Sequence, residues 1–146
     1  MMPTNKLLTS LLLLITLQTY SPLNYADAKP ENILNVVIHV SHSGKRIYQA
    51  AINYARHIRN RHGDSANIAI VANGPGIGFL NSKNTYVSKI KGLFNTGVTF
   101  SACNATIQKL KAEKKPIPII DGVEIVPAGI LKVLELQQQG YLYLQP

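Results

Sequence analysis

Five apolar, strand-like runs separated by helix-like segments are the feature that most restricts what this chain can fold into. The first run, residues 33–40, is almost continuous in apolar and β-branched side chains. Such a run is typical of a strand covered on both faces, as in a parallel sheet. The further strands are expected at residues 68–72, 98–102, 123–126 and 141–144.

Segments with a helical pattern lie between these runs. The first is expected from about Lys45 to Arg61, where a single apolar stripe is formed by Ile47, Ala51, Tyr54 and Ile58. Further helices are expected over residues 85–95 and 104–113, and from the Pro127 region to about residue 139. Strands and helices that alternate with short links predict an α/β protein, a three-layer α/β/α sandwich with a mainly parallel five-stranded sheet.

The first 28 residues have the pattern of a secretory signal peptide. Lys6 supplies a positive charge, residues 7–17 contain eight Leu or Ile residues, and residues 26–28 (Ala-Asp-Ala) fit a small-x-small cleavage site. The apolar stretch is shorter than the roughly 20 residues of a membrane-spanning helix. We therefore expect cleavage near Ala28, a periplasmic mature chain of one domain (residues 29–146), and no stable membrane insertion afterwards. An uncleaved membrane anchor is the alternative.

The chain is basic, with a formal net charge of +8. In a cytosolic protein such a charge indicates nucleic acid as a partner, but export argues against it. The lysines and arginines are spread over several segments, which is typical of a solvated basic surface. We therefore expect no nucleic-acid partner.

Cys103 is the only cysteine, so it has no partner for an intrachain disulfide. It lies where a strand pattern gives way to a helix pattern. Open α/β folds bind ligands at the carboxyl ends of their strands, and a helix N-terminus favours a thiolate over a thiol. Cys103 is therefore a candidate catalytic nucleophile. The alternative interpretation is a small, buried structural side chain.

Two polar loops are expected at the same sheet edge, after the first and second strands. Parallel strands would bring these loops together around the thiol as a small pocket. Its candidate substrate-binding residues are Ser41, His42, Asn73, Gly74, Gly76 and Asn104. His39, within an apolar run, is interpreted as a core side chain with its hydrogen bonds satisfied. The histidine and glycine spacings match neither a metal site nor a dinucleotide fingerprint, so neither a metal nor another cofactor is expected.

Five short motifs follow one another along residues 33–146. They are His39-Val40-Ser41, Asn73-Gly74-Pro75-Gly76, Phe100-Ser101-Ala102-Cys103-Asn104, Ile125-Val126-Pro127-Ala128-Gly129 and Gly140-Tyr141-Leu142-Tyr143. Through them the chain resembles the DsrE/DsrF-like family, in particular its exported single-domain branch. The resemblance implies a compact α/β domain that assembles into homotrimers or homohexamers. It also implies a sulfur relay, in which a cysteine after the third strand carries sulfur as a persulfide.

Cys103 occupies the position of that cysteine. The resemblance therefore implies a thiol-based sulfur carrier or sulfurtransferase, with sulfur donor and acceptor proteins as partners. The alternative is a non-catalytic homo-oligomeric protein, structural or binding a small anion, in which Cys103 is buried. The reactivity of the native thiol distinguishes the two hypotheses.

Overall fold

The computed structural model describes residues 33–146; the signal peptide and cleavage site predicted within residues 1–28 lie outside them. Five strands form one sheet in the order β4-β3-β2-β1-β5, and every pair of neighbours is parallel. The strands are β1 (Leu34–Val40), β2 (Ala66–Ala72), β3 (Thr99–Cys103), β4 (Glu124–Val126) and β5 (Leu142–Leu144). The predicted sheet is confirmed.

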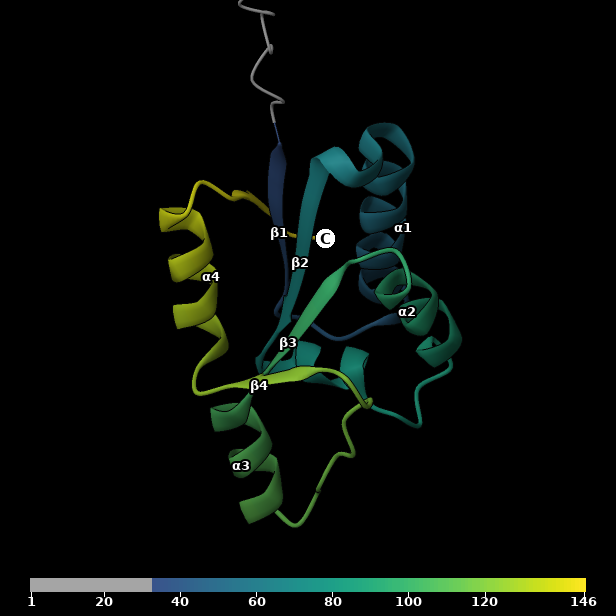
Figure 1. The fold of residues 1–146 in the computed structure, drawn as a ribbon. Coiled ribbons are helices and arrows are strands. Elements are labelled where there is room, and N and C mark those ends of the chain that lie inside the picture. Colours follow the sequence, from purple (N-terminus) through teal and green to yellow (C-terminus); the bar gives the residue numbers. More distant parts are fainter. Residues whose placement is uncertain (1–32) are drawn as a thin grey trace, which may run out of the picture. The chain divides into compact units, whose positions relative to one another are not determined.

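Four α-helices connect the strands: α1 (Lys45–His62), α2 (Val87–Phe94), α3 (Asn104–Ala112) and α4 (Gly129–Gln138). Helices α1 and α2 lie on one face of the sheet and α4 lies on the other, which gives three layers (Figure 1). Within the described residues, no helix is both long enough and apolar enough to span a membrane.

The alternation of side chains along the strands divides the core into two parts. Val36, Ile38 and Val40 of β1 point into the larger part, which contains the buried faces of α1 and α2. Val37 points to the opposite face and packs with Val133 of α4. Strand β1 is thus covered on both faces, as its nearly continuous apolar sequence indicates.

The apolar stripe of α1 differs from the predicted one. Ala51 is buried as expected, but Tyr54 is 39% exposed, and the other fully buried positions are Ile52 and Ala55. The two alanines lie one turn apart and have small side chains, so the helix backbone can pack close to the sheet on that side. The prediction that Tyr54 faces the sheet was therefore wrong.

The glycine-rich segment after β2 forms a 3₁₀-helix, η2 (Gly74–Leu80), where the sequence indicated a loop. A second short 3₁₀-helix, η1 (Gly63–Ser65), follows α1. The start of η2 passes so close to the end of β1 that a Cβ atom at Gly76 would lie 2.0 Å from the Val40 carbonyl oxygen. Only glycine fits there, which fixes η2 against the carboxyl edge of the sheet.

Candidate functional site

Cys103 is the last residue of β3 and the N-cap of α3. The side chains of Phe100 and Ala102 belong to the core beneath α1 and α2, so Cys103 points to the face covered by α4. A Cβ atom added to Gly129, at the start of α4, would lie 3.2 Å from the Cys103 Cβ atom. Cys103 is only 5% exposed in the single chain.

Hydrogen-bond donors surround the buried sulfur. Burial raises the pKa of the Cys103 thiol, but hydrogen bonds from the Thr106 hydroxyl and from the backbone N–H groups of Gly129, Thr106 and Ala105 lower it. The lowering outweighs the effect of burial, so the pKa lies below its usual 9.0. The surroundings of Cys103 therefore stabilise a thiolate, which the sequence position at a helix N-terminus had indicated.

Thr106 connects the thiol to η2. The Gly74 backbone N–H donates to Thr106 Oγ1 at 2.9 Å, which leaves the hydroxyl hydrogen of Thr106 for the sulfur of Cys103. The Ala105 N–H also donates to the Pro127 carbonyl oxygen at 3.2 Å and so links α3 to the segment before α4. The position of Thr106, three residues after an N-cap, was the signal that could have identified it.

A second polar cluster lies beside the first. His39 is 6% exposed; its Nε2–H donates to Asn73 Oδ1 at 3.0 Å, and its Nδ1 is hydrogen bonded to the Tyr143 hydroxyl at 2.9 Å. The interpretation of His39 as a satisfied core side chain is confirmed. Asn73 also packs near the thiol, because a Cβ atom at Gly129 would lie 2.9 Å from the Asn73 Cβ atom.

Two further candidates, Ser41 and His42, lie at the outer rim of this edge. Ser41 Oγ and His42 Nδ1 are hydrogen bonded at 2.9 Å, and Gln145 Nε2 donates to Ser41 Oγ at 2.9 Å. Gln145 and Tyr143 thus bring the C-terminal segment to the site. Their contacts to Ser41 and His39 span 104 positions of sequence, so no local pattern could have revealed them.

The remaining candidates have local roles. Gly76 is buried against Val40. The Asn104 side chain accepts a hydrogen bond from Gln108 Nε2 at 3.1 Å, one turn along α3. Gly74 adopts a positive φ of 48° and presents its N–H to Thr106. The structure therefore places Asn73 and Gly74 beside the thiol, Ser41 and His42 at the rim, and Gly76 in the packing of η2.

A cavity of about 490 Å³ lies between η2 and α3. Gly74 and Thr106 belong to its lining and Cys103 does not, so Thr106 stands between the cavity and the thiol. Among residues 33–146, no group of three or more His, Cys, Asp or Glu side chains is placed to hold a metal ion.

Three solved structures share the fold. They are a protein of unknown function from Methanobacterium thermoautotrophicum (24% identity, TM-score 0.69), the ychN protein from E. coli (13%, 0.64) and a conserved protein of unknown function from Bacteroides thetaiotaomicron (17%, 0.59). Each covers 77% of this chain, and the matches cover 99%, 99% and 94% of those chains. At such identities the likeness shows the fold alone.

No curated protein is significantly similar to the chain. The family match, in contrast, includes the whole described part of the chain. The DsrE/DsrF-like family matches residues 32–146, which include every strand and helix of the sheet and both polar clusters. The chain therefore belongs to the DsrE/DsrF-like family.

Proposed function

We propose that this DsrE/DsrF-like protein is a thiol-based sulfur carrier or sulfurtransferase of the periplasm, with Cys103 as the persulfide site. The observation that carries the proposal is the set of hydrogen-bond donors around the sulfur atom of Cys103. Thr106 and Gly129 contribute to it from two different helices, and together with Ala105 they lower the pKa of the thiol. A buried cysteine with a purely structural role needs no such donors.

Sulfur transfer at this site requires no net oxidation. The Cys103 thiolate attacks the outer sulfur of a donor persulfide, the S–S bond of the donor breaks, and the donor leaves as a thiolate. The outer sulfur is now bound to Cys103 in a new S–S bond. An acceptor thiolate attacks this outer sulfur, and Cys103 leaves as a thiolate, which the Thr106 and Gly129 donors stabilise.

The second candidate function is a non-catalytic homo-oligomeric protein with a structural cysteine. The observation that favours it is the 5% exposure of Cys103. Under the first proposal, the Pro127–Gly129 segment or α3 must move aside before a donor reaches the sulfur. The two functions therefore differ in the reactivity of the folded protein and not in the reactivity of the unfolded chain.

Mass spectrometry after incubation with a small-molecule persulfide donor tests the proposal. We expect the native protein to gain one sulfur atom on Cys103, and the Cys103→Ser variant to gain none. Alkylation with iodoacetamide before and after unfolding provides the control for a competent thiol. If the thiol reacts only in the unfolded chain and the native protein gains no sulfur, the structural function is correct.

We also propose that the chain self-associates, because apolar side chains of α4 are exposed on its outer side. Val133 and Leu136 face the sheet, whereas Ile130, Leu131 and Leu134 are exposed on the outer side. Exposed apolar patches of this kind mark interaction sites. The edge strand β5 adds Leu142, Tyr143 and Leu144, also exposed.

Analytical ultracentrifugation measures the assembly directly. We expect the unmodified protein to sediment as a homotrimer or homohexamer and the Leu131→Gln, Leu134→Gln double variant to sediment as a smaller species. Tyr54→Gln removes an exposed large side chain from α1, on the other face, and is the matched control. A monomeric unmodified protein, or a double variant with an unchanged sedimentation coefficient, would contradict this interface.

The periplasmic location is tested separately. The full chain with a C-terminal tag is expressed in a Gram-negative host, and the periplasmic fraction is collected. We expect the tagged protein in that fraction with an N-terminus that follows Ala28. Recovery of the uncleaved chain from the cytoplasm or from the membrane would contradict export with cleavage.

A further inference from the structure

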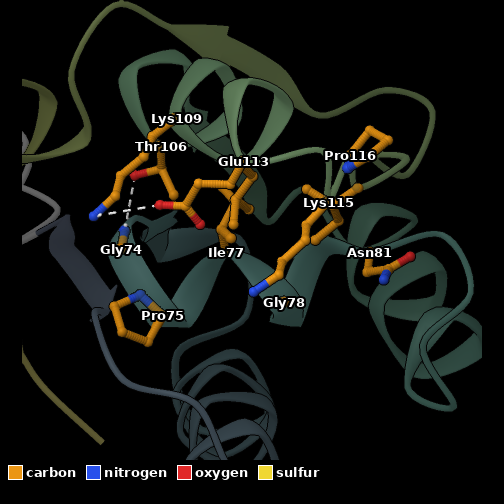
Figure 2. A pocket seen from close by; sticks show the side chains of 12 residues that line it. Gly74, Pro75, Ile77, Gly78, Asn81, Thr106, Lys109, Glu113, Lys115 and Pro116 are labelled. Atoms are coloured by element: carbon orange, nitrogen blue, oxygen red, sulfur yellow. Dashed lines mark hydrogen bonds and ion pairs between the residues drawn. The ribbon is translucent and has the colours of Figure 1, made fainter.

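The cavity between η2 and α3 has the dimensions and lining of a small-molecule site. Its volume of about 490 Å³ lies within the roughly 300–1,000 Å³ of typical ligand pockets. Its apolar walls come from η2, from α3 and from the segment that follows α3, and they consist of Pro75, Ile77, Leu110, Pro116 and Ile117. Figure 2 shows these elements around the cavity, with polar side chains among them.

The turn that ends α3 positions one wall of this cavity. The Lys114 N–H donates to the Lys111 carbonyl oxygen at 3.1 Å, and the Lys115 N–H donates to the Leu110 carbonyl oxygen at 2.9 Å. These two bonds define a Schellman motif, with Lys114 in the left-handed conformation at φ 58°. The motif turns the chain back toward η2, so that Lys115, Pro116 and Ile117 line the cavity.

The wall of the cavity that η2 forms is also fixed in position. Ile77 of η2 is 3% exposed and belongs to the main core. The segment just before it is fixed by the close approach of Gly76 to the Val40 carbonyl oxygen. Because both walls are anchored by backbone contacts, the cavity is preformed, which lowers the entropic cost of binding.

The charged residues that line the cavity determine which sign of ligand charge it favours. Its charged lining residues are Lys109, Lys115 and Glu113. Lys109 Nζ and Glu113 Oε1 are paired at 4.0 Å, whereas Lys115 has no ion-pair partner among residues 33–146. In Figure 2 the Lys115 side chain extends from the segment after α3 toward η2. Lys115 is therefore the one lining cation without an ion-pair partner among the described residues.

We propose that this cavity binds a small organic anion with an apolar body and one negatively charged group. Ile77, Leu110 and Ile117 contact the apolar body, and Lys115 contacts the charged group. Burial of apolar surface supplies the affinity, and Lys115, which is exposed, supplies the preference for an anion. The site goes beyond sulfur transfer at Cys103, because Thr106 separates the sulfur from the cavity and binding does not require the thiol.

Titration of the ¹⁵N-labelled protein with 1-octanesulfonate, below its micellar concentration, tests the proposal by NMR. We expect saturable shift changes at the amides of Ile77, Leu110 and Ile117. Octyltrimethylammonium has the same chain length and the opposite charge, and we expect it to bind at least about tenfold more weakly, a difference of about 1.4 kcal/mol. No saturable shifts at these amides, or equal binding of the two amphiphiles, would overturn the proposal.

Two lysines of the same segment provide a matched pair of variants. We expect Lys115→Gln to weaken octanesulfonate binding by about threefold to fivefold, as the loss of one exposed charge contact implies. Lys111→Gln, which removes the same charge from a residue outside the lining, is expected to leave binding unchanged. An equal loss of octanesulfonate affinity in both variants would show an effect of net charge alone. It would overturn the proposal that Lys115 contacts the charged group of the ligand.

The exposed side of α4 is the competing site for an amphiphile. Saturable shifts confined to Leu131 and Leu134, and abolished by Leu131→Gln, would overturn the proposal as well. The Cys103→Ser variant separates this site from sulfur transfer. We expect it to bind octanesulfonate like the unmodified protein, so that a failure of the persulfide experiment leaves this result standing.

Discussion

The two faces of the sheet are built in different ways. The face under α1 and α2 is apolar throughout, and its core includes fully buried Ile52 and Phe79. The face under α4 carries the smaller cluster of buried apolar residues. It also carries polar side chains at the carboxyl ends of its strands, among them His39 and Cys103.

The two faces therefore differ in what they contribute to the protein. The face with two helices provides most of the apolar burial, which is the main stabilising contribution to folding. The face with one helix carries the hydrogen-bonded side chains of His39 and Cys103, and the outer side of α4 is exposed. The larger apolar core and the polar side chains thus lie on opposite faces of the same strands.

The largest effect on stability is expected when a buried residue of α1 is replaced, and an exposed residue of α4 serves as the comparison. We expect Ile52→Ala to lower the free energy of unfolding by about 2–5 kcal/mol, because it leaves a cavity in the main core. Leu131→Gln, at a residue that is 61% exposed, is expected to change the stability of the isolated chain by no more than about 0.5 kcal/mol. Urea denaturation at low protein concentration measures both; similar losses would remove the contrast.

A pair of helix glycines gives the next largest effect. Gly129→Ala places a Cβ atom 2.9 Å from the Asn73 Cβ atom and 3.2 Å from that of Cys103, so we expect a loss of about 1–3 kcal/mol from overpacking. Gly92 of α2 has no neighbour within 4 Å of an added Cβ atom, and Gly92→Ala is expected to stabilise by about 0.5–1 kcal/mol. Thermal denaturation should therefore move the two variants in opposite directions, and a shift in the same direction would contradict the packing at Gly129.

Much of this arrangement could be predicted from local pattern. The apolar runs identified all five strands, and the change of pattern at Cys103 identified the junction of β3 and α3. Such features are local, because strand burial and helix periodicity appear within a few consecutive residues. The prediction of the buried side of α1 was less accurate. Ala51 and Ala55 are small enough to allow close packing, whereas Tyr54 extends to solvent.

The polar contacts at the site could not be predicted in the same way. His39 and Tyr143 meet because β1 and β5 are neighbours in the sheet, and the strand order is not encoded in any single run. Thr106 and Gly129 surround the thiol from two helices that are distant in sequence. The formation of η2 also escaped detection, because Gly74, Pro75 and Gly76 are typical of a loop.

Thr106 gives a smaller but more specific test of the face under α4. Thr106→Val removes the hydroxyl that donates to Cys103 and accepts from the Gly74 N–H. We expect the pKa of the thiol to rise and the free energy of unfolding to fall by about 1 kcal/mol. Thr106→Ser keeps the hydroxyl and is the control. The pH dependence of thiol alkylation measures the pKa, and an unchanged pKa in Thr106→Val would show that the hydroxyl is not engaged with the sulfur.

The smallest expected effect is a pH dependence of stability that arises from Cys103. The folded pKa lies below the usual 9.0, so the contribution of the thiolate is complete above the unfolded pKa and is lost as the pH falls through the folded value. The free energy of unfolding of the unmodified protein, minus that of Cys103→Ser, should therefore rise with pH in this window. The subtraction removes the titration of groups common to both proteins. Urea denaturation under reducing conditions at a series of pH values measures the difference. A difference that falls toward pH 9 would mean that the face under α4 buries a neutral thiol, and that the hydrogen-bond donors around Cys103 do not stabilise a thiolate.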